Sequence, residues 1–221
     1  MSEDRDTYIP ALRYEWLTGF YDTVMDKLMR ETTFKQALVR QAQITSGHRV
    51  LDLGCGTATL TLMIKQTHPE TEATGLDGDP KALEIARKKI AKSGLAITLD
   101  KGMSFALPYP DNSFDRVFSS LLFHHLTRGD KVRTLKEVHR VLLPGGELHV
   151  ADWGKAGNPL MRLAFFLVQL LDGFKTTQDN VNGLLLDFFS TAGFQDVRET
   201  ARYATIFGTI ALYQARKLAN D

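Results

Sequence analysis

Cysteine is nearly absent from this chain, which has only Cys55 among its 221 residues. A single cysteine excludes an intrachain disulfide framework and a cysteine cluster for zinc, and it favours a reducing compartment. Charge of one sign is not in excess either, because 27 lysines and arginines face 26 acidic residues. The chain therefore has no basic footprint for nucleic acid or for an anionic membrane surface, and a small neutral partner fits better.

Long apolar runs and targeting signals are lacking as well. The apolar segment Leu160 to Leu171 is interrupted by Arg162 and Gln169 and is too short to span a bilayer. The first residues, "MSEDRDTYIPALRYEW", are charged and have no apolar core of the kind found in signal peptides. We therefore expect a cytoplasmic protein with no transmembrane segment and a mature form that starts near Met1.

Short apolar runs that alternate with helical periods predict an α/β fold in a single domain, residues 1–221. The strands that we expect to be parallel are Arg49–Leu53, Glu72–Leu76, Ala96–Leu99, Asp115–Ser119 and Glu147–Ala151. A final hairpin is expected from residues 194–205 and 206–217. The sequence thus predicts a seven-stranded sheet, mostly parallel with an antiparallel last strand, and helices on both faces.

Two further regions are expected to be helical: an N-terminal cap, residues 1–46, and an insertion, residues 153–190, that forms a lid or substrate region. Among the crossover helices, "GDPKALEIARKKIAKSG" has the clearest ends. It places Asp79 at the N-cap, Pro80 at the first helical position and Gly94 just past the last turn.

The stretch "VLDLGCGTATLTL" runs from a buried strand through a glycine-rich turn into a helix. Such a turn lets the backbone approach a ligand closely, which suits a pyrophosphate. Asp52 argues against a phosphate because its carboxylate would repel one, whereas it can accept hydrogen bonds from an ammonium group. Asp77 ends the second strand, where an acidic side chain can hold both hydroxyls of a ribose. An adenosine with an amino-acid end meets both demands.

At these residues the chain resembles the class I S-adenosylmethionine-dependent methyltransferases. "VLDLGCGTA", "ATGLDGDPKAL", "MSFALPYPDNSFDRVFSS" and "RVLLPGGELHVAD" are similar to four motifs of that family, in the family's order, over about Gln36 to Asp152. The run "EVHRVLLPGG" looks closest to the subgroup with the ubiquinone and menaquinone biosynthesis methyltransferases. The resemblance implies a Rossmann-like, doubly wound sheet and S-adenosyl-L-methionine as cofactor.

The resemblance also implies roles for individual residues. The methionine end would be lined by Asp52, Gly54, Cys55, Gly56 and Thr57, the ribose would be held by Asp77 beside Gly78, and the adenine would contact Met103, Ser104 and Phe105. Ser120 would face the sulfonium, and Tyr21 would close over the carboxylate. Two positions depart from the family: Ala58 stands where a third glycine is frequent, and Met103 stands where an aspartate usually accepts from the adenine amino group.

His124 and His125, in "LLFHHLT" just beyond the fourth strand, are the candidate catalytic residues. Methyl transfer is an in-line displacement, so alignment and desolvation supply much of the acceleration. An acceptor that must lose a proton needs a base, and histidine titrates in the useful range. The alternative is a loop pair without a catalytic role. Two adjacent histidines without a third ligand predict no metal site.

The acceptor should be a small, apolar or lipid-like molecule, for which Trp153 is a candidate pocket wall. Leu160 to Leu171 could be a lid, a peripheral membrane contact, a homodimer interface or a buried packing helix. Two other classes of function stay open. One is a non-catalytic S-adenosylmethionine-binding module that acts through a partner, which Met103 suggests. The other is a nucleotide-binding oxidoreductase, against which Asp52 counts.

Overall fold

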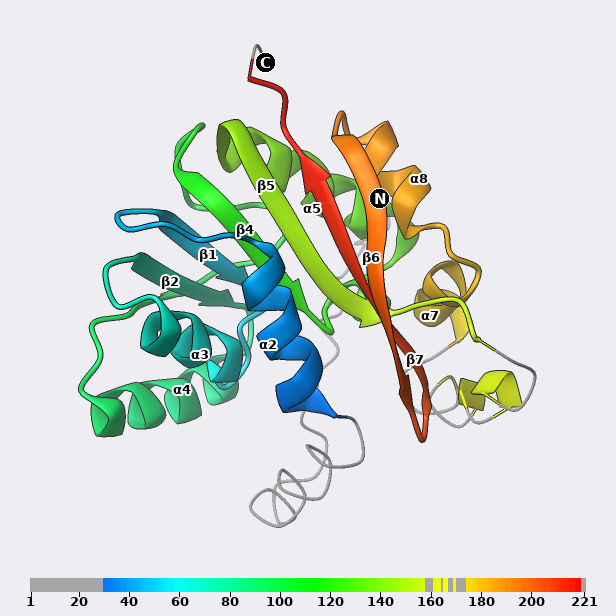
Figure 1. The fold of residues 1–221 in the computed structure, drawn as a ribbon, viewed down its shortest axis with the longest axis horizontal. Helices are drawn as coiled ribbons and strands as arrows, with labels where there is room; N and C mark the ends of the chain where they lie inside the picture. Colours follow the sequence, from blue (N-terminus) through cyan, green and yellow to red (C-terminus); the bar gives the residue numbers. More distant parts are fainter. Residues whose placement is uncertain (1–29, 158–160, 164, 167–168, 170–173, 220–221) are drawn as a thin grey trace, which may run out of the picture.

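A seven-stranded sheet forms the centre of the computed structural model, which describes residues 30–157, 161–163, 165–166, 169 and 174–219 (Figure 1). The strand order is β3-β2-β1-β4-β5-β7-β6. The strands are β1 (Arg49–Leu53), β2 (Glu72–Asp77), β3 (Thr98–Lys101), β4 (Phe114–Ser120), β5 (Leu142–Trp153), β6 (Gln195–Thr205) and β7 (Gly208–Arg216). Only β7 runs antiparallel to its neighbours, β5 and β6. The predicted mostly parallel sheet with an antiparallel last strand is confirmed.

Only β1 has the predicted bounds, and β3 and β5 differ from the prediction the most. The structure begins β3 at Thr98, the residue that pairs with Thr74 of β2, and not at Ala96. It begins β5 at Leu142 and not at Glu147, because Leu142 already pairs with Phe114 before the register shifts between Phe114 and Arg116. Alternation of apolar residues does not reveal such a shift, because the turn glycines interrupt the pattern.

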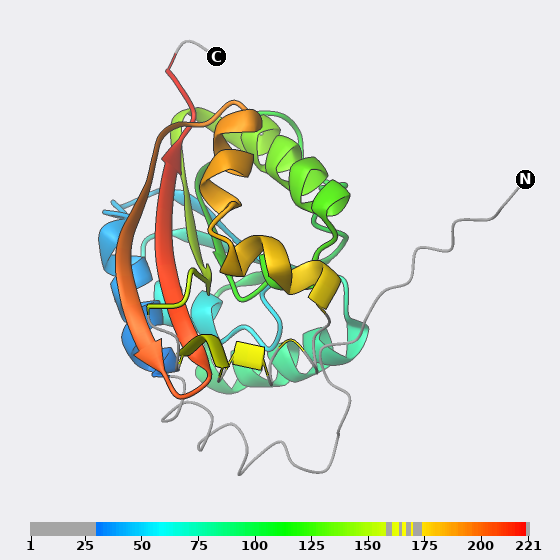
Figure 2. The same cartoon turned by 90° about the vertical axis from the view of Figure 1, so that its right-hand side faces the viewer.

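Helices cover both faces of the sheet, as Figure 2 shows with the sheet seen edge-on. The helical elements are α2 (Glu31–Gln41), α3 (Thr59–Thr67), α4 (Pro80–Ser93), the 3₁₀ turn η1 (Phe123–His125), α5 (Arg128–Val141), α7 (Phe174–Val181) and α8 (Leu185–Thr191). One apolar cluster joins α2 and α3 to the sheet, and another joins α5 and α8 to its opposite face. The predicted ends of α4 are confirmed, since the Asp79 side chain accepts from Lys81 N at 2.8 Å and Gly94 has φ +68°.

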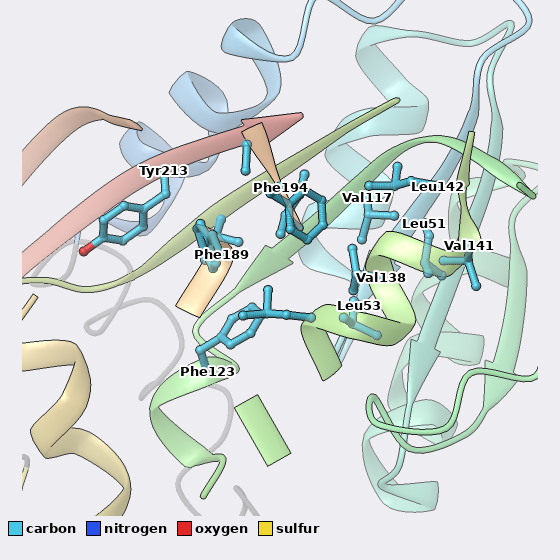
Figure 3. Packing of buried hydrophobic residues seen from close by; sticks show 14 of the residues in the cluster. Leu51, Leu53, Val117, Phe123, Val138, Val141, Leu142, Phe189, Phe194 and Tyr213 are labelled. Atoms are coloured by element: carbon cyan, nitrogen blue, oxygen red, sulfur yellow. The ribbon is translucent and has the colours of Figure 1, made fainter. Parts of the chain in front are cut away.

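The apolar cluster on the face covered by α5 and α8 packs against β4 and β5. Figure 3 shows Val117 of β4 among leucines and valines of β1 and α5, with aromatic side chains at the other end of the group. There the rings of Phe123 and Phe189 lie 6.1 Å apart in an edge-to-face arrangement. A fully buried Phe123 fixes the position of η1 and therefore of the two histidines that complete it.

A buried lysine ties α7 to α5. Lys131 has no exposed side chain, and its Nζ donates to Thr176 O at 2.6 Å and lies 3.7 Å from Asp179 Oδ2. Arg128 pairs with the same aspartate. Burial lowers the pKa of Lys131, while Asp179 raises it. The position of α7 over the sheet thus depends on polar contacts as well as on apolar packing.

Part of the chain that the sequence analysis singled out lies outside the described residues. The first of the two N-terminal helices, with Tyr21, is one such part, and most of Leu160 to Leu171 is another. The described part of that segment is helical and combines buried Phe165 with Leu163 and Phe166, which are 69% and 46% exposed. Among the helices that the structure describes, none has the length and apolar character needed to cross a membrane.

The replacement Lys131→Met tests the tie between α5 and α7. It removes the donor to Thr176 O and one partner of Asp179, so we expect the free energy of unfolding to fall by about 1–3 kcal/mol. Amide hydrogen exchange should show faster exchange in residues 174–181 than in β4 or β5. Lys136→Met, at an exposed position of the same helix, is the matched control. Equal effects of the two replacements would show that Lys131 does not hold α7.

Candidate functional site

The topology brings five loops to one edge of the sheet. Strand order reverses at β1, which has β2 on one side and β4 on the other, both parallel to it. Because β3 and β5 are parallel to these strands as well, the carboxyl ends of all five strands lie at the same edge. In doubly wound sheets, ligands bind in the crevice outside this edge, at the point where the order reverses. The sequence-predicted residues that the structure describes lie at these strand ends or in the loops that follow them.

The turn after β1 has left-handed backbone angles at three positions, which glycine adopts without strain and alanine does not. Gly54, Gly56 and Ala58 have φ values of +71°, +54° and +61°. The N–H groups of Gly54 and Cys55 both donate to Leu76 O, at 2.8 and 3.0 Å, which fixes the turn against the end of β2. A Cβ added at Gly56 would meet no atom within 4 Å, so the turn is open on that side. Open space above a glycine backbone suits a closely approaching ligand.

Cys55 and Thr57 direct their side chains away from one another. The Cys55 thiol is buried, and a Cβ added at Gly75 would lie 3.0 Å from its sulfur, so the thiol packs into the sheet. Burial raises the pKa of this thiol, which therefore stays neutral. Thr57 Oγ1 accepts from Lys89 Nζ of α4 at 2.8 Å. The residue at position 55 thus offers a ligand its backbone, and not its sulfur.

Asp52 is a buried carboxylate at the end of β1, only 1% exposed. Its Oδ2 accepts from Thr61 Oγ1 of α3 at 2.6 Å. Burial raises the pKa of Asp52 to about 6, against the hydrogen bond from Thr61 and the positive charge of Lys35, which both lower it. A charged carboxylate in such surroundings lacks sufficient compensation from the protein, and a cationic group of a ligand would supply it.

Asp77 lies at the end of β2, directly across the turn from Asp52. One carboxylate oxygen accepts from Gly56 N at 2.7 Å and the other from Asp79 N at 2.8 Å. Burial raises the pKa of Asp77, and these backbone donors oppose that effect. The carboxylate is half-buried and keeps unused lone pairs, since each of its oxygens accepts one bond from these donors. It can therefore also accept from hydroxyl groups of a ligand.

The loop after β3 brings Met103, Ser104 and Phe105 near this carboxylate. A Cβ added at Gly78 would lie 3.0 Å from Met103 Sδ, so the thioether lies across Gly78, the residue after Asp77. Ser104 Oγ and Thr134 Oγ1 are 2.9 Å apart, which anchors the loop to α5. The guanidinium of Arg133 lies 4.6 Å from the centre of the Phe105 ring. The part of this loop nearest Asp77 is thus apolar and polarisable.

Ser120, the last residue of β4, has a buried hydroxyl oxygen with no hydrogen-bond partner among the described residues. An unpartnered buried hydroxyl costs free energy and suits a site where a ligand completes its bonding. Together with the open turn and the buried carboxylate of Asp52, this hydroxyl fits a ligand with a cationic end. The residues present are therefore compatible with S-adenosylmethionine.

His124 is held by a buried aspartate at the end of β5. His124 Nδ1 lies 2.8 Å from Asp152 Oδ1, and both side chains are nearly or fully buried. The same carboxylate accepts from Phe123 N, Trp153 N and Asn180 Nδ2 at 2.7–3.0 Å. These contacts lower the pKa of Asp152 despite its burial, with the charge of His124 as the largest lowering influence. Asp152 therefore stays charged and orients the imidazole of His124.

His125 has a different environment from its neighbour. The two imidazole rings lie 3.9 Å apart, tilted by 42°. Burial, followed by the charge of His124, lowers the pKa of His125 to about 3. His125 is consequently neutral near pH 7 and is a weak base. Of the two histidines, His124 has the partner that a proton acceptor requires.

Sequence reasoning missed three residues of this region. Asp152 was quoted only at the end of a motif, although an acidic residue at a strand end was the signal that had identified Asp52 and Asp77. Asn180 lies on α7 and bonds to Asp152 from 28 residues away, a separation that no local pattern reveals. Lys35 is 8% exposed on α2, and its charge acts on Asp52. A lysine in a helix is ordinarily placed on the solvent side, so periodicity gave no signal for it.

The sequence of this chain is similar to those of known methyltransferases. Residues 50–146 match the family model described as a methyltransferase domain. Demethylmenaquinone methyltransferase of Thermus thermophilus is 40% identical over 143 residues, which cover 65% of this chain and 62% of that protein. The enzyme of the same name from Symbiobacterium thermophilum is 31% identical over 171 residues, which cover 75% of this chain and 66% of that protein. The chain thus spans less than two thirds of the length of either relative.

Solved structures share the fold. YcgJ from Bacillus subtilis superposes with a TM-score of 0.70 at 17% identity, over 85% of this chain and 99% of that one. A SAM-dependent methyltransferase from Methanosarcina mazei has a TM-score of 0.66 at 19% identity, over 81% of this chain and 97% of that one. The predicted Rossmann-like sheet and the resemblance to methyltransferases are confirmed. The chain carries a methyltransferase domain at residues 50–146, and it has the fold of a solved S-adenosylmethionine-dependent methyltransferase.

Proposed function

We propose that this protein transfers a methyl group from S-adenosylmethionine to a small, apolar aromatic acceptor of the quinol type. The observation that carries the proposal is the pair of strand-end carboxylates, Asp52 and Asp77, on either side of an open glycine turn. The names of the sequence relatives support a quinone-like acceptor, because both are demethylmenaquinone methyltransferases.

The cofactor would be held along the turn and the neighbouring strand ends. Asp52 would accept from the ammonium group, Asp77 would accept from the ribose hydroxyls, and Ser120 would face the sulfonium. The remaining proposed cofactor contacts are Gly54, Cys55, Gly56, Thr57, Gly78, Met103, Ser104, Phe105 and, outside the described residues, Tyr21. When bound, the cofactor supplies an electrophilic methyl group. The chain supplies alignment and exclusion of water, which account for much of the rate in such displacements.

His124 is the proposed general base. A phenolic or carbon acceptor gives up a proton as it takes a methyl group, so a base near the acceptor accelerates the reaction. Asp152 holds Nδ1 of His124 and so orients the imidazole, and its negative charge would stabilise the imidazolium that forms when His124 takes the proton. Neutral His125 packs against this ring and is proposed to contact the acceptor.

The acceptor would enter between η1 and the turn that joins β6 to β7. Trp153 ends β5, and its ring makes edge-to-face contacts with His124 at 6.3 Å and with Phe165 at 5.0 Å. Beyond these buried rings, Leu163, Phe166 and Ile206 are exposed by 69%, 46% and 53%. Figure 2 shows the described helical residues between positions 161 and 169 beside the β6–β7 turn. We propose that residues 153–190 form the acceptor side of the site and that the exposed apolar groups receive a lipid-like tail.

The proposed activity is tested by incubating the purified protein with methyl-labelled S-adenosylmethionine and a demethylated menaquinol, followed by extraction into organic solvent. We expect labelled product in the organic phase. Label that appears only in water when a whole-cell extract is supplied would contradict a quinol acceptor. Absence of label in both phases, with S-adenosylhomocysteine bound normally in calorimetry, would favour a binding module instead of an enzyme.

Replacing Asp77 tests the assignment of the ribose. Asp77→Ala should weaken S-adenosylhomocysteine and 5′-methylthioadenosine alike, by about 100-fold or more, because both carry the ribose. Lys101→Ala, at the residue paired with Asp77 on β3, is the control and should change neither affinity. Isothermal titration calorimetry gives the affinities, and thermal melting verifies folding. Unchanged affinity in folded Asp77→Ala would refute the assignment.

Asp52 should make cofactor binding depend on pH. Its pKa of about 6 means that the carboxylate is charged at pH 7 and mostly protonated at pH 5, so it loses the attraction for an ammonium group as the pH falls. We expect the affinity for S-adenosylhomocysteine to drop about tenfold from pH 7 to pH 5. Asp52→Asn should bind about 10–100-fold more weakly at pH 7 and with little dependence on pH.

The same variant has two internal controls. Binding of 5′-methylthioadenosine, which lacks the ammonium group, should be insensitive to Asp52→Asn. Without ligand, the free energy of unfolding at pH 7.5 should be higher in Asp52→Asn than in the wild type by about 1–3 kcal/mol. The reason is that the raised pKa of Asp52 makes its charged form destabilise the wild-type fold above pH 6. That gain should vanish as the pH falls below 4, where Asp52 is protonated in both states. An equal loss of affinity for both ligands would contradict the ammonium assignment.

His124→Asn tests the base, because the amide nitrogen of asparagine can still donate to Asp152. We expect kcat to fall by about 10²–10⁴-fold while the affinity for S-adenosylhomocysteine stays unchanged. His68→Asn, at the opposite edge of the sheet, is the control. A kcat within threefold of wild type would exclude His124 as the base.

A further inference from the structure

Met103 has a fixed place in the loop after β3. Gly102 N donates to Asp77 O at 3.1 Å, so the residue before Met103 is bonded to the end of β2. The hydroxyl of Ser104 bonds to Thr134 of α5, so the residue after it is bonded to a helix. Met103 O accepts from Ala106 N at 3.1 Å, which closes the loop. The thioether is therefore carried on a backbone held at both ends.

The thioether occupies the space beside the proposed ribose carboxylate. A Cβ at position 78 would come within 3.0 Å of Met103 Sδ and 3.9 Å of Cε. Glycine at position 78 therefore leaves the room in which the methionine side chain lies. Met103 is also 36% exposed, so one side of this thioether remains accessible. A planar ring attached to a ribose held by Asp77 would meet this surface.

The carboxylates close to this loop each accept from protein donors, and Asp77 is the one proposed to hold the ribose. Asp100 accepts from Tyr109 Oη at 2.9 Å, and Glu137 accepts from Leu107 N at 2.8 Å and from Arg140. Asp77 accepts from two backbone N–H groups. Among the described residues of the loop itself, 102–109, none is acidic. The side chain that this loop presents next to Gly78 is a weak hydrogen-bond acceptor with a polarisable sulfur.

We propose that Met103 makes this protein recognise the flat face of the cofactor's purine and not the substituent at its 6-position. The proposal rests on the cofactor site of the proposed function and adds the basis of its selectivity. A carboxylate at this place would accept from a 6-amino group and repel a 6-oxo group, which is how polar sites reject close analogues. A thioether packs against an aromatic ring irrespective of that substituent. Cofactor analogues with hypoxanthine in place of adenine therefore bind nearly as well.

The experiment compares two ligands that differ only at this group, S-adenosylhomocysteine and S-inosylhomocysteine, by isothermal titration calorimetry. For the wild-type protein we expect dissociation constants within about threefold of each other. Met103→Asp introduces the missing acceptor and should raise the preference for adenine to about 10–100-fold. Met103→Leu keeps the apolar surface without the sulfur and should leave the ratio near that of wild type.

Each outcome separates the selectivity from the activity. A wild-type preference for adenine of tenfold or more would overturn the proposal, and so would an unchanged ratio in a folded Met103→Asp variant. Absence of binding of both ligands would overturn it together with the cofactor site. The protein could show the expected ratios of dissociation constants and yet methylate no quinol. That result would support the role of Met103 and would contradict only the proposed acceptor. Thermal melting of both variants verifies that they fold.

Discussion

The proposed acceptor side of this molecule depends on one buried carboxylate. Asp152 accepts from His124, Asn180 and two backbone N–H groups, and these donors come from η1, α7 and β5. Without them, a charge with no exposure to water would cost several kcal/mol. The requirement to satisfy this charge therefore fixes the relative placement of three elements that the chain supplies far apart. Apolar packing around Phe123 then reinforces the same placement of η1.

The buried carboxylate of Asp52, in contrast, receives little compensation for its charge from the protein. Among the described residues, Thr61 is the one side chain that donates to it, and burial raises its pKa to about 6. The molecule thus contains one aspartate that the fold satisfies and one that it leaves short of positive charge. Asp152 holds protein elements together, whereas the charge of Asp52 remains available to attract a cationic group of a ligand. Unequal compensation of two similar groups is a common way for a fold to separate structural from functional roles.

The approximate positions of the strands, the ends of α4 and the positions of Asp52 and Asp77 could be predicted because each depends on local signals. Strand alternation, an N-cap aspartate followed by proline, and acidic residues at strand ends are all visible within a few residues. The pairing of His124 with Asp152 could not be predicted, because it joins residues 28 positions apart across a strand and a helix. Buried Lys35 and Lys131 were missed for a related reason, since only tertiary contacts make a lysine favourable inside. The early start of β5 depends on a register shift that leaves no periodic trace.

The two halves of the site are built from different stretches of the chain. Apart from Tyr21, the proposed cofactor residues fall between Asp52 and Ser120, on loops bonded to one another through Leu76, Asp77 and Thr134. The proposed acceptor half lies mostly after β5, and α7 is attached through Lys131, Asp179 and Asn180. Among the described residues, α7 also lies against η1, the turn that follows the cofactor half. Under the proposed function, exchange of the segment after β5 would alter the acceptor and leave the cofactor loops in place, so that one scaffold could diversify through a single replaceable stretch of chain.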